Sequence, residues 1–296
     1  MTFEKQIDFS CMHNILIRNP DGSLQPMDEP FFESELIAPG TWMVLSDGDY
    51  SYLVEGGDEA IVIDTGYGAG NIREYCQTLT TKPIINVANT HYHFDHTACN
   101  GYFDAALMSA DTAPLATVPY KSFEGIEFIT DYKRVIIRNG DCIDLGSRKL
   151  EVLEIPCHAV GSLAFLDRAR RIMFTGDEFG PSCNLGGSIG DFIQNMEKLT
   201  LLRGEFDVCY GGGGAFDASY VEKCLALAKD IITGTALEAH GWDSLPSVKG
   251  EPAPEGVTVY MRKCPRPGDG GAGKDHEFKR IVYGYGVRLM YDTREV

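Results

Sequence analysis

The stretch "THYHFDH", residues 90 to 96, restricts what this chain folds into more than any other feature. It holds three of the seven histidines, and the apolar segment "PIINVANTH" (83–91) that runs into it has the β-branched composition of a buried strand. Because alternate residues of a strand point to the same side, His91 and His93 face one volume, and the rest of the motif turns out of the strand beside them. Imidazoles next to a carboxylate suit zinc and a second divalent ion. The stretch therefore predicts a metal site at the end of a strand.

Three other stretches place a metal-binding type of side chain at the end of an apolar run. "AIVIDTG" ends its apolar run at Asp64, "IPCHAVGS" carries His158 after a strand, and "RIMFTGDEF" reaches Asp177 through a Thr-Gly turn. An isolated aspartate at a strand end is usually a cap or turn residue. Together with the histidine motif, and in this order along the chain, the three stretches predict one site built from several strand ends.

Hydrophobic periodicity predicts strands and helices in an order that suits two sheets packed face to face with helices outside. The segment 134–156 reads as two strands with Asn-Gly and Leu-Gly turns, and "DRARR" (167–171) as the tip of a hairpin. "DVCYGGGG" (207–214) reads as a short strand that ends in glycines. Other strands are expected at 41–46, 50–56, 59–66, 83–91, 105–110, 257–263 and 280–291, a hairpin over 163–177, and helices at 71–80, 190–204 and 217–234.

The motifs "VIDTG", "NTHYHFDHTACN", "PCHAVGS" and "IMFTGDEF" resemble, in this order, those of the metallo-β-lactamase-fold hydrolase superfamily. The His-x-His-x-Asp-His element is specific, and the other motifs are weak alone. The resemblance implies an α/β fold, a four-layer αββα metallo-β-lactamase sandwich, with a metal site at one edge between the sheets. We divide the chain into an N-terminal extension (1–34), the metallo-β-lactamase-fold core (35–234) and a C-terminal β extension (235–296) with a Gly- and Pro-rich loop.

The resemblance also implies how the site residues share the metal ions, one or two Zn²⁺ per chain. The implied ligands of the first ion are His91, His93 and His158. The implied ligands of the second ion are Asp95 and His96, with Asp177 bridging the two. Asp64 would act from behind the ligands by orienting them.

The implied activity is hydrolysis of a small carbonyl substrate: an ester, a thioester or a lactone. Zinc lowers the pKa of its bound water to about 7, so a zinc-activated hydroxide is available to attack the carbonyl carbon. Asp95 would accept a hydrogen bond from that hydroxide and then move its proton to the leaving group.

The pattern departs from the family at "VCYGGGGAFD", where a glycine, Gly212 or Gly213, stands in place of one more histidine. Three accounts remain open. A histidine from elsewhere replaces it, His240 first, then His276 or His13. Otherwise water completes a weak second metal position, or the enzyme works with a single metal and a carboxylate base.

Two other kinds of function are alternatives to hydrolysis. The fold also carries iron, so an oxidoreductase of the persulfide dioxygenase type is one alternative, and metal identity separates it from a hydrolase. A degenerate binding protein that has lost catalysis is the other. The intact histidine motif argues against a binding protein, and the missing histidine argues for it.

Composition restricts the partners and the surroundings. The net charge of −17 disfavours nucleic acid. No apolar run approaches the roughly 18 residues of a membrane span, and the polar start "MTFEKQIDFS" does not read as an export signal. Nine cysteines without a CxxC pair suit reduced thiols, so we expect a cytoplasmic protein. Extensions beyond a core often pair across subunits, and we expect a homo-oligomer, most simply a dimer.

Overall fold

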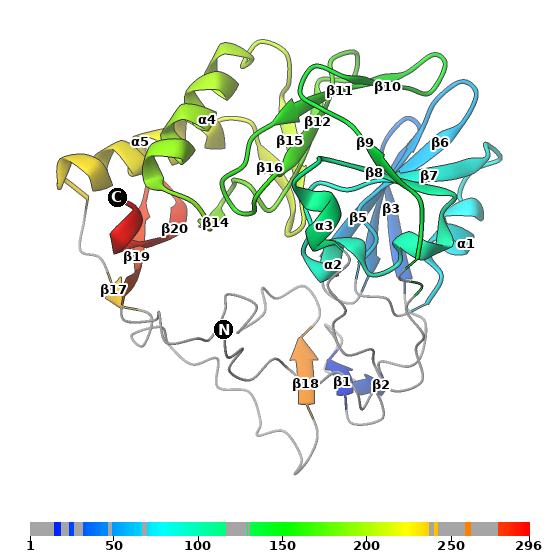
Figure 1. The fold of residues 1–296 in the computed structure, drawn as a ribbon, viewed down its shortest axis with the longest axis horizontal. Helices are drawn as coiled ribbons and strands as arrows, with labels where there is room; N and C mark the ends of the chain where they lie inside the picture. The colour runs from blue at the N-terminus through cyan, green and yellow to red at the C-terminus, as the bar shows by residue number, and fades with distance from the viewer. Residues whose placement is uncertain are drawn as a thin grey trace.

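The computed structural model describes residues 32–46, 49–66, 70–116, 129, 131–236 and 278–296, together with the backbone of four short strands at 15–18, 24–26, 240–241 and 258–261. Two large sheets face each other in the middle of the molecule, and helices cover their outer faces (Figure 1). The predicted four-layer αββα sandwich is therefore confirmed.

The first sheet has seven strands and is antiparallel from β3 to β6 and parallel from β6 to β9. Its strands, in spatial order, are β3 (Phe32–Ala38), β4 (Thr41–Ser46), β5 (Asp49–Glu55), β6 (Ala60–Ile63), β7 (Ile84–Ala88), β8 (Ala105–Met108) and β9 (Arg134–Ile136). Four short helices accompany this sheet: α1 (Ile72–Gln77), α2 (Phe94–Thr97), the 3-10 helix η2 (Asn100–Tyr102) and α3 (Thr112–Leu115).

The second sheet has six strands, of which β13 and β15 run parallel and the other neighbours antiparallel. They are, in spatial order, β10 (Cys142–Asp144), β11 (Lys149–Glu154), β12 (Leu163–Asp167), β13 (Ile172–Gly176), β15 (Val208–Gly211) and β16 (Gly214–Asp217). Helices α4 (Ile189–Leu201) and α5 (Tyr220–Thr233) pack on its outer face (Figure 1).

Both sheets are buried on both faces, which explains why their strands read as nearly continuous apolar runs. In β5, Tyr52 and Val54 join the core between the two sheets, and Leu53 joins the core beneath α1. In β13, Phe174 faces the first sheet, whereas Met173 packs beneath α4 and α5. This alternation follows from the two-residue period of a strand.

A buried arginine also ties the two sheets together. Arg148 donates to the Asp167 carboxylate at 2.6 Å, to the Gly40 carbonyl at 2.7 Å and to the Thr41 hydroxyl at 2.8 Å. Asp167 and Arg148 expose 0% and 1% of their surface. A buried ion pair needs such additional hydrogen bonds to offset the loss of hydration. This one joins β12 of the second sheet to the start of β4 in the first.

Two smaller sheets involve the segments outside the predicted core. One consists of β14 (Ser182–Asn184), β20 (Val287–Asp292), β19 (Lys279–Gly284) and β17 (His240–Gly241). The other consists of β18 (Thr258–Met261), β1 (Ile15–Arg18) and β2 (Leu24–Pro26). A short 3-10 helix, η5 (Thr293–Glu295), follows β20. Because β20 pairs with β14 and Leu289 packs in the core beneath α5, the C-terminal β extension shares a hydrophobic core with the sandwich. The domain boundaries themselves stay a prediction.

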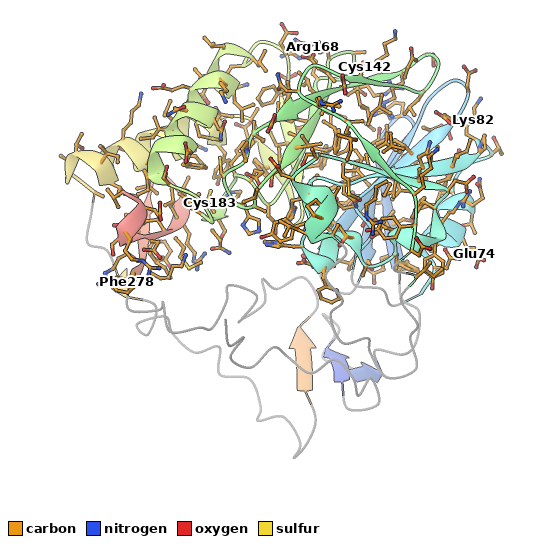
Figure 2. All side chains as sticks on the ribbon, viewed as in Figure 1. Glu74, Lys82, Cys142, Arg168, Cys183 and Phe278 are labelled. Atoms are coloured by element: carbon orange, nitrogen blue, oxygen red, sulfur yellow. The ribbon has the colours of Figure 1, made fainter. Side chains whose placement is uncertain are left out.

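The structure differs from the sequence reading at several places, and strands β1, β2, β3, β14 and β17 were not expected. Segment 134–156 forms three strands rather than two, and the first of them, β9, pairs with β8 of the other sheet. The glycines after β15 lead into a further strand, β16, which was not expected. The reversal predicted at 167–171 is present between β12 and β13, and Figure 2 shows Arg168 there at the outer edge of the molecule. None of the described helices is long and apolar enough to cross a membrane.

Candidate metal centre

The residues singled out in the sequence come together where strands of both sheets end. Asp64 follows β6, and His91 lies three residues after β7. From the second sheet, Asp177 follows β13 directly and His158 lies four residues after β11. The backbone N–H of Leu163, the first residue of β12, donates to the Thr90 carbonyl at 2.7 Å and joins the two edges at this point.

Three imidazole nitrogens converge in the first group. His93 Nδ1 lies 3.0 Å from His91 Nε2 and 2.9 Å from His158 Nε2. The ligand-capable atoms of the three residues all lie within 4.8 Å of one another. The structure thus brings together the three residues that were expected to share the first metal.

The outward nitrogens of two of these rings have partners that decide which nitrogen carries the proton. His158 Nδ1 donates to the carbonyl of Asn184 at 2.7 Å. His91 Nδ1 lies 3.0 Å from the Thr90 hydroxyl, which itself donates to Asp64 Oδ2 at 2.7 Å and can therefore only accept from the ring. Both rings then present an unprotonated Nε2 to His93. A proton on His93 Nδ1 can be donated to only one of these two nitrogens, so at least one lone pair remains for a cation, and this group fits a metal ion.

The surroundings keep these rings neutral. Burial and the neighbouring histidines hold the pKa of His91 well below its usual range. Burial, together with His158 and His96, lowers the pKa of His93 to about 3. Neutral imidazole is the form that binds a metal, so no proton competes at these two positions near neutral pH.

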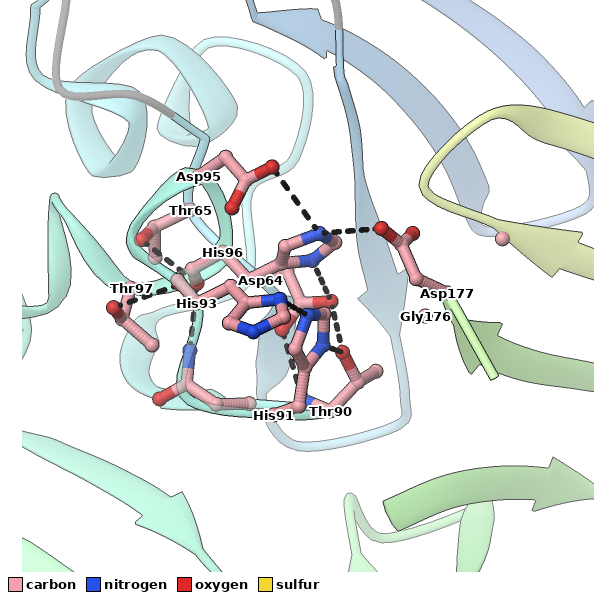
Figure 3. A network of polar contacts seen from close by, with 12 residues as sticks. Asp64, Thr65, Thr90, His91, His93, Asp95, His96, Thr97, Gly176 and Asp177 are labelled. Atoms are coloured by element: carbon pink, nitrogen blue, oxygen red, sulfur yellow. Dashed lines mark hydrogen bonds and ion pairs between the residues drawn. The ribbon is translucent and has the colours of Figure 1, made fainter. Parts of the chain in front are cut away.

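The second group surrounds His96 (Figure 3). Its Nε2 is buried and has no hydrogen-bond partner among the described residues. Oδ2 of Asp177 lies 3.6 Å from this nitrogen and Oδ2 of Asp95 lies 3.9 Å from it. A buried nitrogen with two carboxylates at this distance fits either a proton or a second cation between them.

Electrostatics at this second group favour positive charge. Burial lowers the pKa of His96, but the carboxylates of Asp64, Asp177 and Asp95 outweigh burial and raise it well above its usual range. Burial likewise opposes ionisation of Asp177, and the histidines around it outweigh burial and lower its pKa. A divalent cation would take the place of the proton on His96.

Asp64 lies behind both groups; it bonds directly to His96 of the second group and reaches His91 of the first through Thr90. It accepts hydrogen bonds from the Thr90 backbone N–H at 2.8 Å, from the Thr90 hydroxyl at 2.7 Å and from His96 Nδ1 at 2.9 Å. Its backbone is left-handed, with φ of 57°, which is uncommon for a residue other than glycine and occurs mainly at functional sites. Thr90 was missed by the sequence reasoning, although its hydroxyl stands directly before the first histidine of the motif.

The glycine that stands in place of a further histidine can now be located. A Cβ on Gly212 would lie 2.3 Å from Asp177 Oδ1 and 3.1 Å from His96 Cε1, whereas a Cβ on Gly213 would meet nothing within 4 Å. Gly212 is therefore the glycine beside the second group. The carboxylate of Asp177 occupies the space in which a side chain at position 212 would begin.

Of the three histidines predicted to replace the absent one, the structure describes only the backbone of His240. His240 opens β17, which pairs with β19 at the edge of the sheet that contains β14, and its side chain is outside the described residues. His13 and His276 are also outside the described residues. A role for any of them stays a prediction.

A groove of about 710 Å³ adjoins the first group. Its lining includes His158 and Tyr92 from the metal centre, and also Glu154, Asp191 and Lys198.

An αββα sandwich with a histidine cluster at the ends of its strands is the architecture of the metallo-β-lactamase-fold proteins. The chain belongs to the metallo-beta-lactamase superfamily, whose family model matches residues 47–252. The family predicted from the motifs is therefore confirmed.

Of two curated relatives, one is a thioesterase by name and the other a hydroxyacylglutathione hydrolase. The chain is 31% identical over 220 residues to the acyl-coenzyme A thioesterase MBLAC2 of Homo sapiens, covering 62% of this chain and 78% of that protein. It is 26% identical over 183 residues to the hydroxyacylglutathione hydrolase of Rhodospirillum rubrum, covering 57% of this chain and 66% of that protein.

Solved structures show the same fold at low sequence identity. A metallo-beta-lactamase from Pontibacter korlensis superposes with a TM-score of 0.55 at 19% identity, covering 68% of this chain and 100% of that one. The metallo-beta-lactamase FIM-1 from Pseudomonas aeruginosa, in its mono-zinc form, superposes with a TM-score of 0.54 at 17% identity, covering 69% of this chain and 97% of that one.

Proposed function

We propose that this protein is a metal-dependent hydrolase whose substrate is a small thioester. The observation that carries the proposal is the first histidine group, in which two Nε2 atoms with their protons held elsewhere face His93 Nδ1. The choice of a thioester among carbonyl compounds rests on the similarity to MBLAC2 and to hydroxyacylglutathione hydrolase.

In this proposal His91, His93 and His158 hold the first metal. Asp95, His96 and Asp177 surround the second metal position. These three residues are its only proposed protein ligands, because Gly212 contributes no side chain. A bound zinc ion supplies a Lewis acid for the carbonyl oxygen and lowers the pKa of water. Zinc is the expected metal because three neutral imidazoles form a common zinc ligand set.

The residues of the chain divide the remaining work between orientation and proton transfer. Asp64 and Thr90 hold the proton of His91 on Nδ1 and keep its Nε2 available. Asp95 is the proposed general base, because its carboxylate lies at the second group near His96 Nε2 and can pass a proton to a departing thiolate. The groove beside His158 would hold the rest of the substrate.

Metal content and thioester cleavage, measured together, test the proposal. The purified protein is analysed for zinc and iron per chain with nothing added, and thiol release is followed with an acyl-CoA and with an S-acylglutathione. Bound zinc with chelator-sensitive thiol release supports the proposal. Iron in place of zinc would favour the persulfide dioxygenase alternative, and failure to bind any metal after reconstitution would favour a binding protein.

A further inference from the structure

Glu178, the residue after Asp177, is fully buried, with 0% of its surface exposed. No lysine or arginine among the described residues forms a salt bridge with it at 4.0 Å or less. A carboxylate in such a place requires hydrogen-bond donors to offset the loss of hydration. For Glu178 these donors are backbone N–H groups.

Three consecutive backbone N–H groups point at this one carboxylate. Cys157 N–H donates to Oε2 at 2.5 Å, His158 N–H donates to Oε2 at 2.9 Å, and Ala159 N–H donates to Oε1 at 3.3 Å. Successive N–H groups that converge on an anion fix the backbone torsion angles of the residues that carry them. Glu178 therefore holds the three N–H groups of 157–159, the segment that presents His158.

Other groups hold the rest of this segment. Asn195 Nδ2 donates to Cys157 Sγ at 3.2 Å, and the Ala159 carbonyl accepts from the Ser162 hydroxyl at 2.8 Å and from the Ser162 N–H at 3.3 Å. The Cys157 carbonyl accepts from Gly186 N–H at 2.9 Å, and the His158 ring reaches the Asn184 carbonyl at 2.7 Å. These contacts hold the carbonyl and the ring. The N–H groups of 157–159 are held by Glu178.

We propose that Glu178 is a positioning residue that acts through the backbone of 157–159 to place the imidazole of His158 against His91 and His93. It touches neither the metal position nor the substrate groove. This inference rests on the metal site of the proposed function, and it is independent of the proposed thioester.

The test compares Zn²⁺ affinity in Glu178→Gln, His158→Ala and the double variant, by competition of the metal-free proteins with a chelating indicator. Gln keeps the size of Glu but turns an NH₂ group toward N–H donors. We expect Glu178→Gln to weaken zinc binding by about 10- to 100-fold, the range found when a partner of a metal ligand is removed. In the His158→Ala background the same change should alter the affinity by less than about twofold, because the residue through which it acts is gone.

Two further variants separate positioning from general destabilisation. Asp167→Asn alters another fully buried carboxylate, next to the hairpin tip at the opposite end of β12, and should lower the unfolding temperature without changing zinc affinity. Glu178→Asp keeps the charge but withdraws it from the N–H groups, and it should bind zinc as weakly as Glu178→Gln. It serves as the test if Glu178→Gln does not fold.

Each outcome has one meaning. Zinc affinity within twofold of wild type in both Glu178 variants would overturn the inference and leave the metal site intact. Equal losses in the wild-type and His158→Ala backgrounds would also overturn it, since Glu178 would then act elsewhere. Wild-type protein that binds no zinc, or a His158→Ala variant that binds it normally, would overturn the proposed metal site itself.

Discussion

The short distance between Gly212 and the Asp177 carboxylate predicts that a side chain at position 212 lowers the proposed activity. In Gly212→Ala, the new Cβ starts 2.3 Å from Asp177 Oδ1, and an ordinary contact is about 3.5 Å, so the carboxylate must move by roughly 1 Å. A displacement of about 1 Å at a reacting centre costs about 100-fold in rate. We therefore expect kcat/KM for thioester cleavage to fall by about that factor.

The fold should tolerate this change. Gly212 does not have a positive φ, so alanine fits its backbone, and the atom that must move is the end of a side chain. A forced side-chain torsion costs about 0.5–1.5 kcal/mol, and replacing glycine by alanine returns about 0.4–1 kcal/mol through the unfolded state. The unfolding free energy should thus change by less than about 1 kcal/mol.

The matched control is Gly213→Ala, whose Cβ meets nothing within 4 Å and which should keep wild-type kinetics. The assay follows thiol release together with zinc content per chain. Gly212→His should also fail to raise activity, because its side chain begins at the same obstructed Cβ. Wild-type kcat/KM in Gly212→Ala, or an equal loss in Gly213→Ala, would refute the reasoning.

Three other changes test separate parts of the structure. Arg148→Met should lower the unfolding free energy by about 3–5 kcal/mol in chemical denaturation, because it leaves Asp167 buried without its main partner, whereas Arg171→Ala at an exposed ion pair should cost less than about 1 kcal/mol. Equal losses would contradict the role of burial. Thr90→Val removes the hydroxyl between Asp64 and His91 and should weaken zinc binding by about 10-fold or more in a chelator competition. Unchanged zinc affinity would contradict the role of Thr90 in orienting His91. Asp95→Asn should lower kcat by about 100-fold while the zinc of the first position remains in elemental analysis, and an unchanged kcat would remove Asp95 as the base.

The sequence was sufficient for the fold class and for the residues that converge at the centre. The order of strand ends carried that information, because each of Asp64, His91, His158 and Asp177 follows an apolar run. It was not sufficient for the residues that hold these side chains. Glu178 bonds the backbone N–H groups of a segment about 20 residues away in the chain, and the Asn184 carbonyl bonds the His158 ring. No spacing rule links a carboxylate to three distant N–H groups. Segment 134–156 was misread because local turn signals do not tell which sheet a strand joins.

The carbonyl of Asn184 that holds His158 belongs to β14, and β14 forms its sheet only by pairing with β20. Asn184 Oδ1 also accepts a hydrogen bond from Arg288, 104 positions further along the chain. During synthesis, His91, His93 and His158 therefore leave the ribosome well before β20, the strand that supports β14 and through it His158. We expect the emerging chain to hold zinc weakly until β20 has been made, so that metal loading comes at the end of folding.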